Sequence, residues 1–245
     1  MKNILIVESE NDEYFIEALA IKVSLENEVR KIYQYRRSSL DEKKLTTTLI
    51  TALTDARSRG AAKIGVILDM DNSTKEERIK FINDCIEKSF SECAYPSPSN
   101  LLVNTSQFVK NPMDDESFVE IACFFVNVDG EGELETVLKA IKSQPSIFAD
   151  CLYDGWLNCL TEKGKKLGKK GEQCDISEKE LLKLWVDFYK RFDTLKRQKR
   201  NKDNTGWKEI ILGKKEPLTT TRGEEIFDLN ASELDDIKSF LNMFD

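Results

Sequence analysis

The sequence predicts an α/β fold in which helices flank a mainly parallel sheet, followed by a helical C-terminal extension. Buried, β-prone runs alternate with helical stretches of about 12 to 15 residues, which is typical of βαβ units. Near residue 143 this alternation ends, and the sequence becomes helical in pattern and locally basic. We therefore predict an α/β core over residues 1–143 and a mostly helical, partly basic region over 144–245 that packs on the core.

The first part of the chain is expected to alternate three strands with three helices. Contiguous branched residues indicate strands buried on both faces, and apolar residues at helical spacing indicate the helices. Asn11 or Asp12 is the expected cap of the first helix, and Ser73 or Thr74 that of the third. The expected strands are 2–7, 28–35 and 63–68, and the expected helices are 13–24, 45–58 and 75–90.

The second part is expected to add two strands and several helices. An edge strand is predicted over 101–109 and a central strand over 118–128, with helices over 133–141, 146–160, 177–196 and 231–244. Four aromatic residues in the third of these helices recur at i, i+3, i+4 and i+7. This spacing favours a core stripe over base stacking for Trp185, Phe188, Tyr189 and Phe192.

The chain contains no histidine, which excludes several classes of chemistry. Ser-His-Asp and Cys-His catalysis, histidine-ligated zinc and histidine nucleases all need that side chain. The six cysteines form no C-x-x-C pair, so we expect most to be small buried hydrophobic residues. Carboxylates without histidine favour hard cations such as Mg²⁺ or Mn²⁺, which prefer oxygen ligands.

No apolar run approaches the roughly 18 residues that a membrane span needs. The first residues also lack a basic segment followed by a long apolar one, the pattern of a signal peptide. We therefore expect a cytoplasmic protein without membrane contact.

Acidic residues follow three of the predicted strands. Glu8 follows the first, with Asp12 four residues on, and Asp69 and Asp71 follow the third as a D-x-D motif. Residues at i and i+2 of an extended chain share a face, so both aspartates can present oxygens to one cation. Charges beside a buried strand are costly to desolvate unless a positive partner compensates them.

A third acidic group, Gly130 to Glu135, follows the central strand. Its glycines allow a tight turn, and acids in a first helical turn also suit the helix dipole, which is the structural explanation. Each group alone is a weak signal, whereas three such groups in a chain without histidine favour a metal site.

This arrangement resembles the toprim superfamily, in which a strand runs into Glu and a later strand into D-x-D. VESENDEYFIEAL, CFFVNVDGEGELETVL and IFDLNASELDDIKSFL are similar to small stand-alone toprim-like proteins related to overcoming-lysogenization-defect nucleases. The likeness covers about residues 3–143 and the C-terminus. One departure is Ser9, where toprim families usually have Gly.

The resemblance implies a role for each acid. Glu8 would be a general acid/base or a metal ligand, and Asp69 and Asp71 the principal Mg²⁺ ligands. Asp12 and Glu135 would be candidate ligands of a second metal.

A basic segment over 163–215 holds 17 Lys or Arg and 8 Asp or Glu, although the whole chain carries a net charge of −7. Contact with nucleic-acid phosphates and plain solvation both explain such a segment. The candidate nucleic-acid-binding residues are Lys165, Lys166, Lys169, Lys170, Lys196, Arg197, Lys199 and Arg200.

The leading hypothesis is a Mg²⁺- or Mn²⁺-dependent nuclease acting on DNA or RNA. The chain has no P-loop, and similar stand-alone toprim proteins often act beside a separate ATPase, some in antiviral defence. The alternative is a non-catalytic toprim module that binds nucleic acid or a protein partner. A primase-like role would need a zinc-binding module, and topoisomerase chemistry would need gate domains, neither of which the sequence shows. Whether the chain forms a homodimer is left open.

Overall fold

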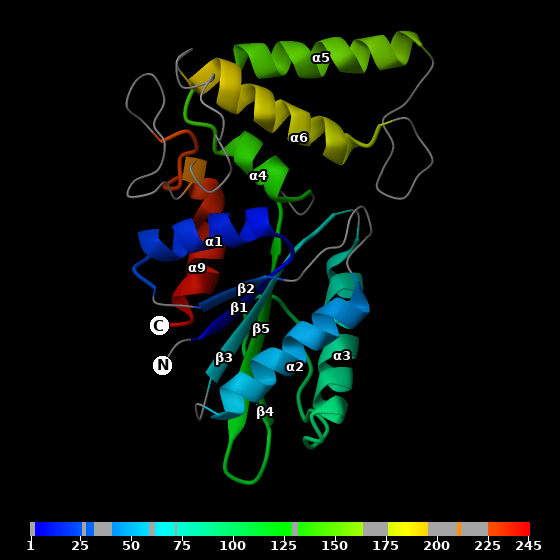
Figure 1. Cartoon of the computed structure of the whole chain (residues 1–245), viewed down its shortest axis with the longest axis vertical. Coiled ribbons are helices and arrows are strands. Elements are labelled where there is room, and N and C mark those ends of the chain that lie inside the picture. Colours follow the sequence, from blue (N-terminus) through cyan, green and yellow to red (C-terminus); the bar gives the residue numbers. More distant parts are fainter. Residues whose placement is uncertain are drawn as a thin grey trace. The chain divides into compact units, whose positions relative to one another are not determined.

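A five-stranded mixed sheet forms the centre of the first part of the chain in the computed structural model (Figure 1). The strands lie in the order β2-β1-β3-β5-β4, and all neighbours are parallel except the antiparallel pair β4–β5. The strands are β1 Ile4–Val7, β2 Glu28–Lys31, β3 Ala62–Asp69, β4 Val109–Pro112 and β5 Phe118–Val126. The predicted α/β class and mainly parallel sheet are confirmed.

The structure describes residues 3–25, 28–31, 41–58, 62–71, 73–128, 132–163, 176–195, 210–211 and 225–245. The chain divides into two compact units, one of residues 1–126 and 235–245 and one of residues 127–234. This division differs from the one that the sequence predicts at residue 143. Residues 127–143 group with the second unit, and the last eleven residues group with the first.

Among the described residues of the first unit, four helices flank the sheet. Helices α1 and α9 lie on one face, and α2 and α3 lie on the other (Figure 1). Their bounds are α1 Glu10–Lys22, α2 Glu42–Ser58, α3 Lys75–Glu92 and α9 Asp235–Asn242. Both faces are therefore covered, which explains why the central strands are continuous apolar runs rather than alternating ones.

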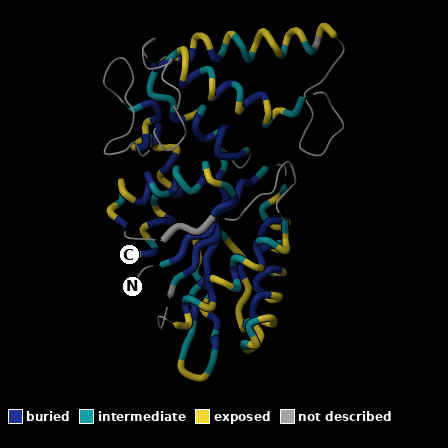
Figure 2. The backbone as a smooth tube through the Cα atoms, viewed as in Figure 1, coloured by how far each residue is buried: buried dark blue, intermediate teal, exposed yellow. Residues whose placement is uncertain are grey.

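The core between the sheet and helices α2 and α3 consists of alternate strand residues packed against apolar helix residues. Ile4 and Ile6 of β1 and Ile64 and Val66 of β3 are fully buried in it. Figure 2 shows the same result as dark blue along these strands. Since alternate residues of a strand point to opposite faces, the residues between them turn toward α1 and α9.

Gly65 of β3 allows the last helix to approach the sheet closely. A Cβ atom at this position would lie 2.6 Å from Phe244 and 2.8 Å from Leu5. Phe244 also contacts Phe108 and Phe240 through its ring, at centroid distances of 5.1 and 5.3 Å. The end of the chain is thus part of the core of the first unit.

Two local predictions are corrected. Helix α1 begins at Glu10 with Ser9 as its cap, not at Glu13 with Asn11 or Asp12, because the Ser9 hydroxyl reaches the first turn. The edge strand is 109–112 rather than 101–109. The amide of Asn83 instead holds Leu102 by two hydrogen bonds of 2.9 Å, so this backbone is satisfied by a side chain.

The second unit is helical in the part that the structure describes. Its elements are α4 Leu134–Ala140, α5 Ile147–Glu162, α6 Glu178–Phe188, a π-helical turn Tyr189–Thr194 and a short 3₁₀ helix Ser232–Leu234. The predicted aromatic stripe is confirmed for Trp185 and Tyr189, which are buried and stacked at 5.2 Å. Phe192 is 39% exposed, because the π-helical turn changes the spacing of the side chains.

None of the helices in the described parts of the chain combines the length and apolar composition that crossing a bilayer requires.

We expect Gly65→Ala to lower the free energy of unfolding by about 1 to 3 kcal/mol, because the new methyl group overpacks the contact with Phe244. Urea unfolding followed by circular dichroism measures the change. Gly155→Ala is the matched control, since Gly155 lies inside α5 with open space around it. This control should gain about 0.5 to 1 kcal/mol from helix propensity. Equal stability of Gly65→Ala and the unaltered protein would contradict the close packing.

Candidate metal centre

Glu8 and Asp69 meet at the carboxyl ends of two neighbouring parallel strands. In the register of β1 and β3, Val7 pairs with Ile67, so Glu8 lies beside the end of β3. The backbone N–H of Asp69 donates a hydrogen bond to Oε2 of Glu8 at 3.3 Å. The exposed fractions are 2% for Glu8 and 6% for Asp69. The structure thus brings these two candidate acids together.

Ser9 and Asp12 join the end of β1 to the start of α1. The Ser9 hydroxyl accepts a hydrogen bond from the backbone N–H of Asp12 at 3.4 Å and donates one to the Asp12 carboxylate. Asp12 is 5% exposed in the first helical turn, where the helix dipole favours negative charge. Ser9 has φ −139°, an extended conformation that does not require glycine.

Asp71 lies in a left-handed backbone conformation, with φ 48°. Asparagine and aspartate adopt this conformation more readily than most residues. Its Oδ2 atom accepts a hydrogen bond of 2.6 Å from Nη2 of Arg78, and both side chains are less than 10% exposed. Asp69 and Asp71 each place a carboxylate oxygen within 4.8 Å of the other.

In the part of the first unit that the structure describes, four carboxylates of low exposure lie near the ends of β1 and β3: Glu8, Asp12, Asp69 and Asp71. Their chemistry fits Mg²⁺ or Mn²⁺, which bind carboxylate oxygens, and fits soft ions less well. Sequence reasoning missed Arg78. The signal was a lone basic residue seven positions after the D-x-D on the apolar face of α3.

Two buried cysteines of the first unit are unsuited to metal binding. Burial raises the pKa of Cys123 to about 12 and that of Cys85 to about 11. Both thiols are therefore protonated at neutral pH, whereas a soft metal needs the thiolate. Both are small buried residues. The prediction that most cysteines are buried is wrong for the described residues, because Cys93 is half-buried and Cys151 and Cys159 are exposed.

The acids that follow β5 belong to the second unit. Glu133 caps helix α4 and forms a salt bridge with Lys179. Gly132 has φ +99°, and a Cβ there would lie 2.7 Å from Thr136, so this turn requires glycine. Glu135 is 4% exposed in the first turn of α4. Its predicted role as a ligand of a second metal stays a prediction.

One protein-family model matches almost the whole chain. The model of the family DUF3226, described as a protein of unknown function, matches residues 2–244. The chain belongs to the DUF3226 family. The comparisons with curated proteins and with solved structures gave no match.

The candidate nucleic-acid-binding residues of this DUF3226 chain all fall in 164–175 and 196–209, which lie outside the described residues. Phosphate binding by Lys165, Lys166, Lys169, Lys170, Lys196, Arg197, Lys199 and Arg200 therefore stays a prediction.

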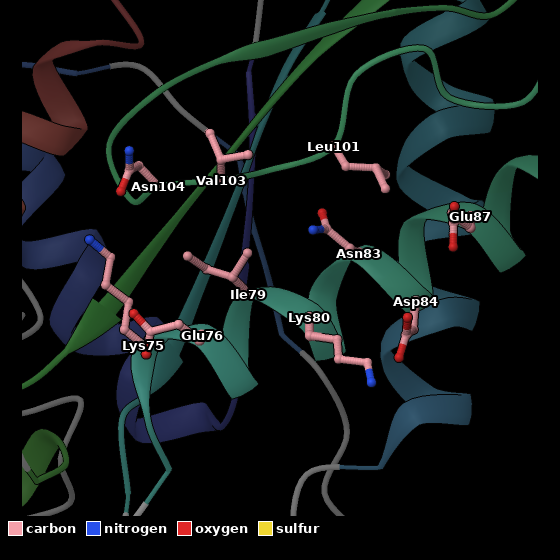
Figure 3. A pocket seen from close by; sticks show the side chains of 10 residues that line it. All are labelled: Lys75, Glu76, Ile79, Lys80, Asn83, Asp84, Glu87, Leu101, Val103 and Asn104. Atoms are coloured by element: carbon pink, nitrogen blue, oxygen red, sulfur yellow. The ribbon is translucent and has the colours of Figure 1, made fainter.

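A groove of about 330 Å³ runs along α3 and the segment 101–104 (Figure 3). Two lysines and three acidic residues line it, together with Ile79, Leu101 and Val103. This mixture gives no net positive charge, so the groove does not favour phosphate. The amide of Asn83, which also faces it, is already bonded to Leu102.

We expect Ser9→Ala to destabilise this DUF3226 protein by about 1 kcal/mol, because the first turn of α1 loses its side-chain cap. Ser9→Gly should cost only a few tenths of a kcal/mol, since glycine also caps helices. Thermal unfolding of both variants beside the unaltered protein gives the comparison. Unchanged stability of Ser9→Ala would show that the hydroxyl of Ser9 does not act as a cap.

Proposed function

We propose that this protein is a toprim-type, Mg²⁺-dependent nuclease that hydrolyses phosphodiesters of DNA or RNA. The observation that carries the proposal is the pairing of Glu8 with Asp69 at the ends of parallel strands, with Asp71 two residues on. Functional groups of open α/β sheets gather at this edge. The absence of histidine restricts the chemistry to groups such as these carboxylates.

The order of the elements supports the toprim assignment. A strand ends in Glu8, a helix brings Asp12, and a neighbouring parallel strand ends in the D-x-D of Asp69 and Asp71. The toprim resemblance of the sequence includes these same four positions. Ser9 fits the pattern in place of glycine because its φ is negative.

In the proposed reaction Asp69 and Asp71 would hold the ion, Glu8 would be a general acid/base or a ligand, and Asp12 would be a candidate ligand of a second metal. Divalent cations at such a site activate water and stabilise charge on the phosphate oxygens. The N–H of Asp69 fixes Oε2 of Glu8 by a hydrogen bond. This contact orients the Glu8 carboxyl, so that it can accept or return a proton at a fixed position.

A separate ATPase, in a defence system, is the proposed partner of this chain, which contains no P-loop of its own. The support for this part is the resemblance to stand-alone toprim proteins. Nucleic acid would be held by the basic segment, and the association of two copies is left open.

A non-catalytic toprim module is the second candidate, and one observation favours it. Arg78 binds Asp71 through a buried ion pair, so part of the negative charge is compensated without a metal. Such a module would bind nucleic acid or a protein partner and would not cleave. Metal binding separates the two candidates.

We expect Asp69→Asn to abolish Mn²⁺ binding in calorimetry and to remove metal-dependent cleavage of plasmid DNA, single-stranded DNA and structured RNA. Glu8→Gln should lower the cleavage rate by about 10²- to 10⁴-fold, because a general acid/base is lost. Asp84→Asn on the exposed side of α3 is the control and should behave as the unaltered protein.

Three outcomes separate the hypotheses. Cleavage that needs metal and both acids supports the nuclease and identifies the substrate. Metal binding without cleavage points to an effector that waits for its partner. Neither binding nor cleavage would exclude the nuclease and leave the non-catalytic module.

We expect replacement of Lys196, Arg197, Lys199 and Arg200 by glutamine to weaken nucleic-acid binding. The slope of log affinity against log salt should fall by about 0.7 to 0.9 for each phosphate that the variant no longer neutralises. Fluorescence anisotropy at several salt concentrations measures this slope. Lys43→Gln on α2 is the control. An unchanged slope in the fourfold variant would show that the basic segment is only solvated.

A further inference from the structure

Arg78 of α3 reaches into the candidate metal centre from the buried side of the helix. Its side chain is 9% exposed and its Nη2 atom lies 2.6 Å from Oδ2 of Asp71. Its Nε atom donates a second hydrogen bond, of 3.4 Å, to the backbone carbonyl of Met70. The guanidinium is therefore fixed against both the side chain and the backbone of the D-x-D.

The backbone around this contact is equally constrained. The N–H of Met70 donates to the carbonyl of Val126 at 3.2 Å, and the N–H of Ser73 donates to the carbonyl of Met70 at 3.2 Å. Asp71 itself is held in the left-handed region. With the backbone fixed in this way, the contact with Arg78 helps to hold the Asp71 carboxylate in its position.

A guanidinium and a divalent cation compete for one carboxylate. Both are attracted by its charge, and each repels the other across a few ångströms of poorly solvated protein. A buried arginine is also costly to desolvate unless it is paired, and the carboxylate of Asp71 provides this pairing for Arg78. The same contact that prepares Asp71 in the metal-free protein therefore opposes the binding of a metal.

We propose that Arg78 is a positioning residue that serves as the internal counter-cation of the D-x-D and lowers the affinity of the site for divalent cations. This inference rests on the proposed function, because it concerns the same metal site. In the metal-free protein Arg78 compensates Asp71, and a bound cation shares or takes over that carboxylate.

Arg78→Gln tests the proposal, since glutamine keeps a polar side chain and removes the charge. We expect it to bind Mn²⁺ about 10- to 100-fold more tightly than the unaltered protein in calorimetry, because repulsion between the two cations is lost. Its unfolding temperature without metal should be lower, and Mn²⁺ should raise that temperature more than in the unaltered protein. Arg78→Lys keeps the charge and should stay near the affinity of the unaltered protein.

The outcomes distinguish this inference from the proposed function. Equal or weaker Mn²⁺ binding by Arg78→Gln, beside measurable binding by the unaltered protein, would overturn the role of Arg78 alone. No Mn²⁺ binding by the unaltered protein would overturn both proposals.

A second measurement covers the case in which Arg78→Gln does not fold. The Nε–H signal of Arg78 in ¹⁵N spectra of the unaltered protein should shift or exchange faster with water when Mg²⁺ is added. A signal that Mg²⁺ leaves unchanged, while calorimetry shows binding, would overturn the proposal.

Discussion

The burial of acidic side chains at the ends of parallel strands is the constraint on which the first unit depends. Glu8 and Asp69 are almost fully removed from solvent, although isolated buried carboxylates are strongly unfavourable. Nearby donors compensate Glu8 and two neighbouring acids. The backbone N–H of Asp69 donates to Glu8, the hydroxyl of Ser9 donates to the carboxylate of Asp12, and Arg78 forms an ion pair with Asp71.

These compensating groups come from rigid elements rather than loops. Arg78 lies in α3, whose capping box of Thr74 and Glu77 fixes the start of the helix just after the D-x-D. On the opposite face of the sheet, Gly65 lets Phe244 pack directly against β3. Helices on both faces thus hold the strand that carries Asp69 and Asp71 in a fixed position, which a catalytic or binding site requires.

The sequence predicts the parts of this arrangement that depend on local pattern. Buried branched runs locate β1, β3 and β5, and the acids that follow β1 and β3 are found where parallel strands end. The pattern does not single out Ser9 as a cap, because neighbouring Asn11 and Asp12 cap helices equally well. Only the position of the first turn decides among the three.

The remaining features depend on contacts between distant residues, which pattern alone does not encode. The apolar stretch near Leu101 has the pattern of a strand. The side-chain amide of Asn83, nineteen positions before Leu102, nevertheless forms the backbone hydrogen bonds that a strand partner would form, so this stretch is not a strand. The last eleven residues group with the first unit, although a long helical and locally basic stretch separates them from it in the sequence. The pairing of Arg78 with Asp71 is likewise visible only once α3 is placed.

The pairing of buried acids with donors of the protein itself also affects what a metal would do in this protein. Sites that fold only with their metal leave ligands unpaired in the free chain, and binding then supplies the folding free energy. Here Arg78 already compensates Asp71, and the N–H of Asp69 already binds Glu8. Part of the negative charge of the site is therefore compensated by groups of the protein itself. Under the proposed function, a bound ion would serve the chemistry of the phosphodiester, and Arg78 would weaken its binding.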